Sequence, residues 1–277
     1  MKLILENHEK TQKWIEVFKV LKNLNSYATI CSKEESMFIQ IMDDSHVCLM
    51  NVNIEKEWFD FYESNDETFS FISSIVVKIL HLYSEGARLC IETNEDKMNI
   101  QFVYPDNSEK IFEIHLIDID RDMLDPQNID GSVEFEMNTK VLDKYISEML
   151  LFGDSMEFAC FEENIYMKSY GEEGKYTLKL PHENMDELIV EDDLKLKTKI
   201  SLKYLSYITK GHAAFQQLTI KIQKDVPIEV DILEDNMEIR YYIAPKISDD
   251  EEEEEEDDFS EYIKKEEYEN LENVVLS

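Results

Sequence analysis

Three aspartates at alternate positions, Asp118, Asp120 and Asp122, have the spacing of carboxylate ligands at the start of a calcium-binding loop. In such a loop the sixth position is a glycine that allows a sharp turn, and the twelfth is a bidentate glutamate. Here those positions hold Met123 and Ile129. We therefore predict no calcium site in this stretch.

Other sequence patterns that could indicate a catalytic, phosphate-binding or metal site are incomplete or absent. Gly171-Glu-Glu-Gly174-Lys175 has two residues between its glycines instead of the four of a phosphate loop, and no Ser or Thr follows, so we predict a hairpin turn. No H-E-x-x-H, G-x-S-x-G or G-x-G-x-x-G motif occurs. The cysteines lack the paired spacing of zinc sites and are predicted to be reduced thiols; they are Cys31, Cys48, Cys90 and Cys160. We predict no enzyme activity, no cofactor and no metal.

Basic residues could bind an anion, because they recur on the polar faces of four predicted amphipathic helices. The helices are expected at His8–Leu24, Ser70–Tyr83, Asn138–Leu151 and Ser201–Lys210. In chain order the basic residues are Lys10, Lys13, Lys19, Lys22, Lys78, His81, Lys140, Lys144, Lys203 and Lys210. Acidic residues dilute the pattern, namely Glu16, Asp143 and Glu148. Two interpretations stay open: four solvated faces, or one surface that presents lysine to phosphates without reading sequence.

Strands dominate the rest of the chain. Runs that alternate apolar and polar residues predict sheets with one buried face. They are Met37–Ile41, Val47–Val52, Arg88–Ile91, Met98–Val103, Ile111–Ile117, Val133–Met137, Met156–Cys160, Ile165–Tyr170, Tyr176–Leu180, Leu218–Ile222, Ile228–Leu233 and Met237–Ile243. These runs and the four helices together predict an α+β protein.

The order of the elements repeats, which indicates an internal duplication. A helix, strands, a second helix and more strands fill residues 1–117, and the same order fills residues 133–247. Residues 118–132 between them are acidic and contain Pro126, so they read as an interdomain loop. Residues 248–277 form a tail with ten consecutive acidic residues at 249–258 and then scattered apolar residues, typical of a solvated spacer followed by a possible short helix or docking segment.

The charge balance restricts the binding partners. The 277 residues include 62 acidic and 28 basic side chains, a net charge of −34, and the tail 248–277 contributes −13, which leaves −21 on the body. A DNA-binding surface on this chain must therefore be a local basic patch. No run of about 18 apolar residues and no apolar leader occurs, so we expect an intracellular protein without a membrane partner.

Several segments, in order, resemble proliferating cell nuclear antigen, the eukaryotic-type DNA sliding clamp. They are Gln40-Ile-Met-Asp-Asp-Ser-His-Val-Cys-Leu49, Phe59-Asp-x-Tyr62, Lys78-Ile-Leu80, Leu116-Ile-Asp-Ile-Asp120, Leu202-Lys-Tyr-Leu205 with Thr209-Lys210, Asp225-Val-Pro227 and Tyr241-Tyr-Ile-Ala-Pro-Lys-Ile247. Each motif alone is weakly specific, but the ordered set is highly specific. The resemblance covers residues 1–247.

The resemblance implies a duplicated clamp fold, with two similar domains that carry inner helices and outer antiparallel sheets. It further implies that three copies close head to tail into a ring around duplex DNA. Carried over by position, Lys22, Lys78, His81, Lys144 and Lys210 would line the bore, whereas the remaining basic residues are assigned from their helix faces alone. Ser147 and Leu151 stand where cellular members carry a cation and a histidine.

Two protein-binding surfaces follow from the same resemblance. A pocket under the interdomain loop would take partner peptides of the Q-x-x-hydrophobic-x-x-aromatic-aromatic type, and its expected residues are Met42, His46, Val47, Leu49, Leu124, Pro126, Pro227, Tyr242, Ala244 and Pro245. Subunit contacts would pair the edge strands Ser108–Leu116 and Lys175–Leu180, through Lys110, Phe112, Ile114, Tyr176, Leu178 and Leu180.

The resemblance thus implies a non-enzymatic processivity factor. Its expected partners are double-stranded DNA, two further copies of itself, a DNA polymerase, a clamp loader and repair proteins, in the nucleus or at a viral replication site. One alternative is a clamp-fold adaptor or decoy that binds partner peptides without encircling DNA. Another is an acidic chaperone of basic proteins that acts through its tail.

Overall fold

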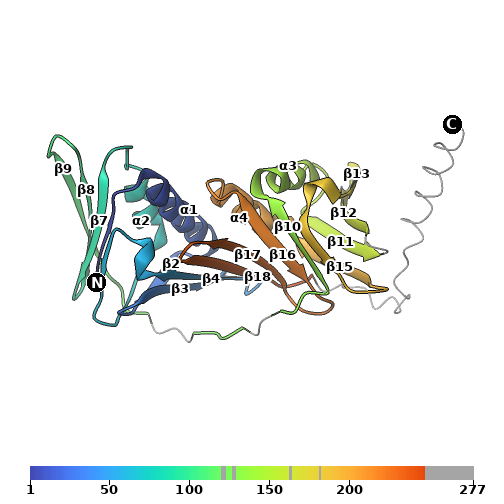
Figure 1. Cartoon of the computed structure of the whole chain (residues 1–277), viewed down its shortest axis with the longest axis horizontal. Helices are drawn as coiled ribbons and strands as arrows, with labels where there is room; N and C mark the ends of the chain where they lie inside the picture. Colours follow the sequence, from blue (N-terminus) through green and yellow to red (C-terminus); the bar gives the residue numbers. More distant parts are fainter. Residues whose placement is uncertain (120–122, 127–128, 162–163, 181, 247–277) are drawn as a thin grey trace, which may run out of the picture.

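A computed structural model describes residues 1–119, 123–126, 129–161, 164–180 and 182–246 of the chain. The described part of the molecule is elongated, with its α-helices along one side and its β-sheets along the other (Figure 1). The expected tail 248–277 lies outside the described residues. Residues 120–122 and 127–128 of the interdomain loop lie outside them too.

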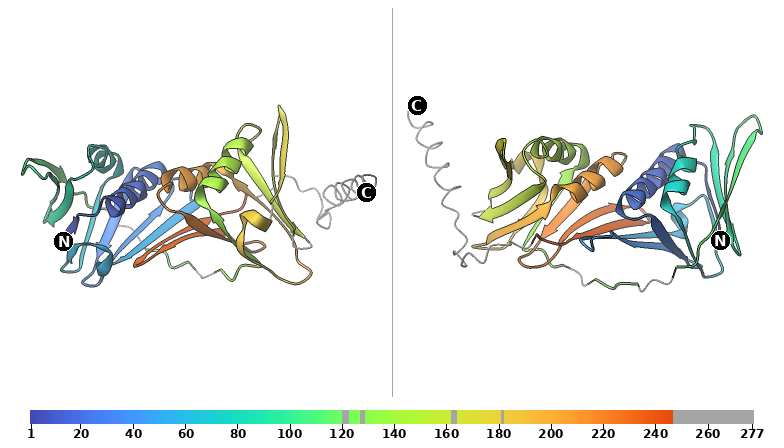
Figure 2. Two further views of the ribbon diagram at one scale, coloured as in Figure 1. Left: turned by 45° about the horizontal axis from the view of Figure 1, so that its top comes forward. Right: turned by 180° about the vertical axis from the view of Figure 1, so that it is seen from behind.

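The helices form one row. They are α1 (His8–Leu24), α2 (Ser73–Leu80), α3 (Thr139–Met149) and α4 (Leu202–Gly211). Neighbours in the row are α2 and α1, α1 and α4, and α4 and α3 (Figure 2). Gly211 lets α4 approach α1 closely, because a Cβ at that position would lie 2.1 Å from Cγ2 of Val20.

Eighteen strands are described. They are β1 (Lys2–Leu5), β2 (Tyr27–Ser32), β3 (Ser36–Met42), β4 (Cys48–Glu55), β5 (Phe61–Glu63), β6 (Glu67–Ile72), β7 (Arg88–Asn94), β8 (Lys97–Val103), β9 (Glu109–His115), β10 (Val133–Asn138), β11 (Ser155–Phe161), β12 (Asn164–Gly171), β13 (Gly174–Lys179), β14 (Asp186–Val190), β15 (Lys195–Ser201), β16 (Gln217–Ile222), β17 (Ile228–Glu234) and β18 (Met237–Ile243). Short 3-10 helices follow β4, at Lys56–Trp58, and precede β14, at His182–Asn184.

Three antiparallel sheets result, and the central one joins the two halves of the chain. Its order is β14-β10-β16-β17-β18-β4-β3-β2-β6, and the flanking sheets are β5-β1-β7-β8-β9 and β13-β12-β11-β15. The junction is β18 against β4, where Tyr242 is paired with Leu49. The C-terminal strand of the second half therefore lies beside the first half.

The core lies between the helix row and the sheets. Trp14 and Phe18 of α1 are almost fully buried, and the ring of Phe18 stacks on Phe71 of β6. Each half has the same element order, from a first strand and helix to a final three-strand run. The expected duplicated α+β arrangement, with helices on one side and antiparallel sheets on the other, is confirmed.

The sequence analysis was wrong at the start of the second helix. Ser70–Ile72 belongs to β6, because Phe69 and Phe71 alternate toward the core as in a strand, and α2 begins only at Ser73. Six strands were not predicted at all: β1, β2, β5, β6, β14 and β15.

Candidate functional site

The row of helices carries an exposed cation on each helix. Lys22 of α1, Lys78 of α2, Lys144 of α3 and Lys210 of α4 are exposed. Three further expected residues are also exposed, namely His81, Lys140 and Lys203. The ammonium of Lys203 lies 5.0 Å from the ring centre of Tyr204, and Lys19 is half-buried.

Two of the expected cations point elsewhere. Lys13 is only 8% exposed, and its ammonium binds Glu9 at 2.9 Å and Glu234 at 2.7 Å. Burial alone would lower the pKa of Lys13, but the carboxylates of Glu234 and Glu9 outweigh it and raise the pKa. Lys10 donates to the carbonyl of Trp58 at 2.5 Å. The expectation that Lys13 is an exposed cation is wrong, because the sequence does not show that β17 brings Glu234 against α1.

The acidic residues that lie among the lysines of the helix faces accept hydrogen bonds from neighbouring elements. Glu16 of α1 accepts the backbone N–H of Ala214 at 2.8 Å, beyond the end of α4. Asp143 of α3 accepts the hydroxyl of Thr209 on α4 at 2.8 Å. The phenol of Tyr176 donates to Glu148 at 2.7 Å. These carboxylates therefore join neighbouring elements.

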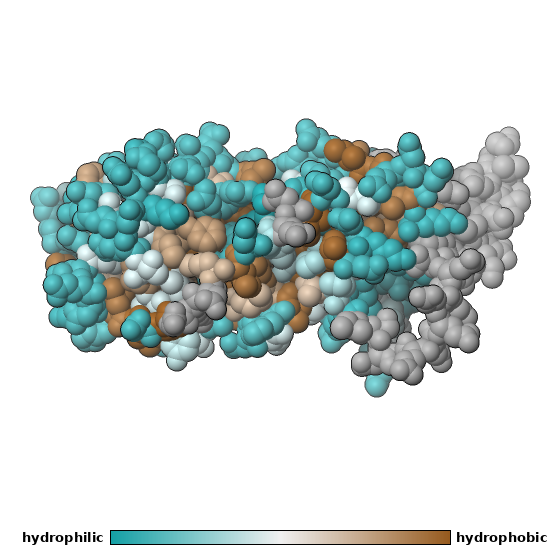
Figure 3. Space-filling view, turned by 90° about the horizontal axis from the view of Figure 1, so that it is seen from below, coloured by the Kyte–Doolittle hydropathy of each residue, from teal (hydrophilic) through white to brown (hydrophobic). Residues whose placement is uncertain are grey.

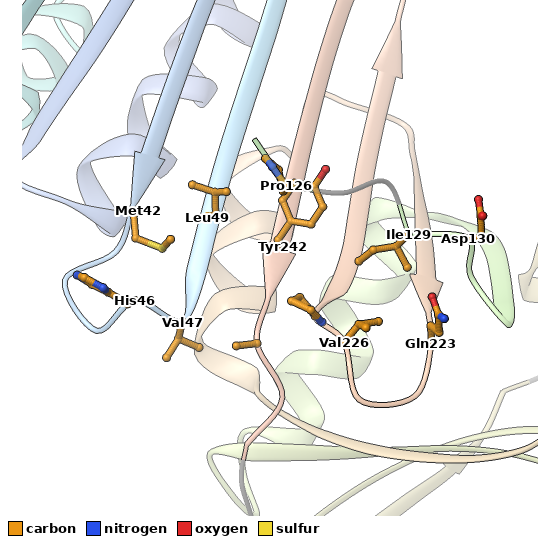
Figure 4. Close-up of a pocket in the computed structure, with 12 residues that line it drawn as sticks. Met42, His46, Val47, Leu49, Pro126, Ile129, Asp130, Gln223, Val226 and Tyr242 are labelled. Carbon is orange, nitrogen blue, oxygen red and sulfur yellow. The ribbon is translucent and has the colours of Figure 1, made fainter. Parts of the chain in front are cut away.

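A pocket of about 570 Å³ opens where β3 and β18 end and β4 begins (Figure 4). Eight of the ten expected pocket residues line it: Met42, His46, Val47, Leu49, Pro126, Pro227, Tyr242 and Ala244. Leu124 lines a second hollow next to it, together with Gln40, and Pro245 lines neither. Figure 3 shows hydrophobic surface near the middle of the side opposite the helices.

Four residues of the pocket wall were missed. They are Ile129, Asp130, Gln223 and Val226. Val226 lies inside the Asp225-Val-Pro227 motif, so its position between two noted residues was the available signal. The other three carry no comparable pattern.

Asp43 fixes the loop between β3 and β4 that forms one wall. Its Oδ1 accepts the backbone N–H groups of Val47 and Cys48, both at 2.7 Å, and the phenol of Tyr204 on α4 donates to its Oδ2 at 2.7 Å. Burial would raise the pKa of Asp43, but these donors stabilise the carboxylate and lower it. The φ angle of His46 is +58°, a left-handed conformation that this network holds.

Gln40 holds the interdomain loop against the central sheet. Its side-chain amide donates to the carbonyl of Leu124 at 2.8 Å, and its Oε1 accepts the N–H of Leu124 at 2.7 Å. This pair of bonds imitates a step of a β-ladder. It positions Leu124 and, two residues later, Pro126 at the pocket.

The two strands expected at subunit contacts lie at opposite ends of the molecule (Figure 1). Among the described residues β9 pairs only with β8, and β13 only with β12, so each is an edge strand. Four of the expected side chains pack partly on their own core, namely Phe112, Ile114, Tyr176 and Leu178, whereas Lys110 is exposed. Leu180 is 1% exposed, so its assignment to a contact surface is wrong.

Exposed apolar side chains instead mark both ends of the helix row. Ile75 and Leu82 lie on and after α2, and Leu150 and Leu151 follow α3. Leu151 is 74% exposed, and Ile111 on β9 is 63% exposed. Sequence reasoning noted Leu151 only as a departure within the bore.

The described residues hold no cluster of His, Cys, Asp and Glu that could bind a metal ion. None of their helices is long and apolar enough to span a membrane.

Comparison with known proteins identifies the fold family. The family model of the N-terminal domain of proliferating cell nuclear antigen matches residues 6–124, and that of the C-terminal domain matches residues 127–246. The chain belongs to the proliferating cell nuclear antigen family. The boundary between the two matches falls inside the expected loop 118–132.

Relatives of this clamp family come from a virus, an archaeon and an animal. A probable DNA polymerase sliding clamp 2 of Paramecium bursaria Chlorella virus 1 is 26% identical over 245 residues, covering 85% of this chain and 88% of the relative. The proliferating cell nuclear antigen of Caenorhabditis elegans is 28% identical over 248 residues, covering 85% and 94%. The crystal structure of proliferating cell nuclear antigen from Thermococcus kodakaraensis aligns with this chain with a TM-score of 0.80 at 18% identity, covering 88% of this chain and 99% of that one.

Proposed function

We propose that this chain is a DNA sliding clamp, a non-enzymatic processivity factor. The observation that carries the proposal is the single row of four helices, each with an exposed lysine, on a chain with a net charge of −34. Lysines that contact phosphates bind DNA of any sequence, because every phosphate is alike. An acidic exterior discourages other contacts with DNA.

A head-to-tail homotrimer would close this row into a ring. The edge strands β9 and β13 at opposite ends can complete a sheet between neighbouring copies. Exposed Ile75 and Leu82 at one end of the helix row would then meet Leu150 and Leu151 of the next copy. Burial of these apolar surfaces would stabilise the contact.

The pocket would recruit the proteins that work on DNA. Its apolar wall, formed by Met42, Leu49 and Tyr242, suits a short helical turn with aromatic anchors. A DNA polymerase, a clamp loader and repair enzymes that carry such peptides would share it. The clamp would act where DNA is replicated, in the nucleus or at a viral replication site.

The lysines can be tested by equilibrium binding to a short open-ended duplex in two unrelated sequences. We expect the variant K22Q/K78Q/K144Q/K210Q to bind both sequences much more weakly and with a shallower salt dependence than the original chain. The matched control K2Q/K33Q/K56Q/K97Q removes the same number of charges outside the helix row and should bind normally. Equal affinities of all three proteins would contradict the proposal and favour the adaptor or decoy that never encircles DNA.

A further inference from the structure

The outer face of the sheet β13-β12-β11-β15 carries most of its charge as lysine. Leu196 and Ile200 of β15 point into the core, so the alternate residues Lys195, Lys197 and Lys199 share the opposite face. The strands β12 and β13 add Lys168, Lys175 and Lys179 to this face. Among the described residues of this face the one carboxylate is Glu157, whereas Asp192 and Asp193 lie in the turn before β15. We call these six lysines the lysine face.

The lysines surround a small apolar cluster. In the register of the sheet Ala159 lies between Lys197 and Tyr166, and Tyr166 lies opposite Lys179. The ammonium of Lys179 is 5.7 Å from the ring centre of Tyr166. Ala159, Phe161 and Tyr166 are at most 3% exposed, although they lie on the face away from the main core.

The sheet at the other end of the molecule has no such bias. On the outer face of β5-β1-β7-β8-β9, Lys2 lies 3.8 Å from Glu92, and Lys97 lies 2.8 Å from Glu113. Cations and carboxylates alternate there. The lysine face is therefore a local feature of the second half.

The duplication predicts what crosses this face. After β9 the backbone N–H of Ile117 donates to the carbonyl of Ser70 on β6 at 2.9 Å, and the chain continues as the interdomain loop across the outer side of the sheet, where Gln40 binds Leu124. After β18 the N–H of Lys246 donates to the carbonyl of Lys199 on β15 at 2.7 Å. The same number of positions separates Ser70 from Lys199, Ile117 from Lys246, and the start of α2 from that of α4.

We propose that the acidic segment 249–258 binds across the lysine face, as the second-half counterpart of the interdomain loop. The segment has ten consecutive carboxylates and begins three residues after Lys246, whose backbone is bonded to β15. Ten extended residues reach about 33 Å, more than the roughly 14 Å spanned by three strand spacings. The short tether gives the segment a high effective concentration at the face, so individually weak ion pairs suffice.

Zero-length carbodiimide cross-linking of the full chain, with peptide mapping, tests the contact. At low salt we expect residues 249–258 to couple mainly to the lysine face, and the yield to drop severalfold in K195Q/K197Q/K199Q and in high salt. The matched control K22Q/K78Q/K210Q should keep the full yield. Cross-links spread evenly over Lys2, Lys22 and Lys97 would overturn the proposal.

A competing polyanion gives an independent readout. A full-length variant with every Asp and Glu of 249–258 replaced by Asn or Gln should bind fluorescent oligothymidylate through the lysine face, and adding K195Q/K197Q/K199Q should abolish this gain. The original chain should bind it severalfold more weakly than the neutralised variant. Equal binding by the two would mean that nucleic acid, and not the acidic segment, occupies the face. The test does not involve ring closure or the peptide pocket, so it stands apart from the proposed clamp function.

Discussion

The helix row and the pocket that we propose binds peptides lie on opposite sides of the sheets, and their polar groups are held in different ways. On the helix row, cations such as Lys78 and Lys144 are exposed on long side chains. At the pocket, Asp43 and Gln40 fix backbone groups with bonds of 2.7 to 3.0 Å. Exposed lysines tolerate movement of a phosphate chain, whereas a fixed wall selects a particular peptide shape. If the helix row slides on DNA and the pocket binds partner peptides, as we propose, the two activities need not interfere with each other.

We expect the largest effect from a change that disrupts the proposed trimer and leaves the helix row and the pocket of each copy intact. The change I111D places a charge on an exposed apolar residue of edge strand β9, and burying that charge at a subunit contact would cost several kcal/mol. Light scattering should then report a lower molar mass than for the original chain. The matched control L233D alters a residue that is 64% exposed and lies on neither edge strand, so it should keep the original mass. Loss of assembly in both variants would contradict the proposed edge contact.

A pocket variant should affect peptides and leave DNA binding unchanged. The change M42E introduces a charge into the apolar wall, and we expect a clamp-binding peptide with two aromatic anchors to lose about 2 kcal/mol, or about thirtyfold in affinity. Fluorescence polarisation measures this loss. In the reciprocal experiment K78Q should bind the peptide normally. Equal losses in both variants would show that the two surfaces are coupled.

Tyr204 of α4 forms a direct side-chain bond between a lysine-bearing helix and the loop between β3 and β4, because its phenol donates to Asp43. The change Y204F removes the donor to Asp43 and should lower the free energy of unfolding by about 2 kcal/mol, since hydrogen bonds to charged groups contribute about that much. Urea denaturation measures it. We expect only a few-fold loss of peptide affinity, because the backbone donors to Asp43 remain. The control Y207F alters a neighbouring half-buried tyrosine of α4 and should change neither quantity strongly.

We expect the smallest effect from His212, at the end of α4, which makes the free energy of unfolding depend on pH. The residue is fully buried beside the hydroxyl of Tyr241, and burial lowers its pKa to about 3. The unfolded chain binds a proton near pH 6.5 and the folded chain does not, so stability falls as the pH drops below 6.5. The slope from this group is about 1.4 kcal/mol per pH unit until its folded pKa is reached. Urea denaturation of H212F between pH 7.5 and 5.5 should show a shallower pH dependence than the original chain, and an equal slope would contradict the assignment.

The sequence predicted local patterns well and long-range pairing poorly. The apolar faces of α1 and α4 revealed both helices, since each face repeats with helical spacing. The burial of Lys13 could not be foreseen, because its partner Glu234 is 221 positions away. Strand β15 was missed because Thr198 stands between Leu196 and Ile200, so only two apolar residues mark its buried face.

The candidate pocket followed from the family resemblance and not from local pattern. Residues distant in sequence, such as Met42 and Tyr242, meet there because β18 pairs with β4. Asp130 and Gln223 escaped notice since polar loop residues carry no periodic signal.

The molar mass of the unmodified chain in solution tests the proposed ring most directly. Light scattering across a dilution series at moderate salt should give a mass near three times 32.8 kDa that persists on dilution. That result would place three helix rows around one bore. A mass of 32.8 kDa at every concentration would contradict a stable ring and favour the clamp-fold adaptor.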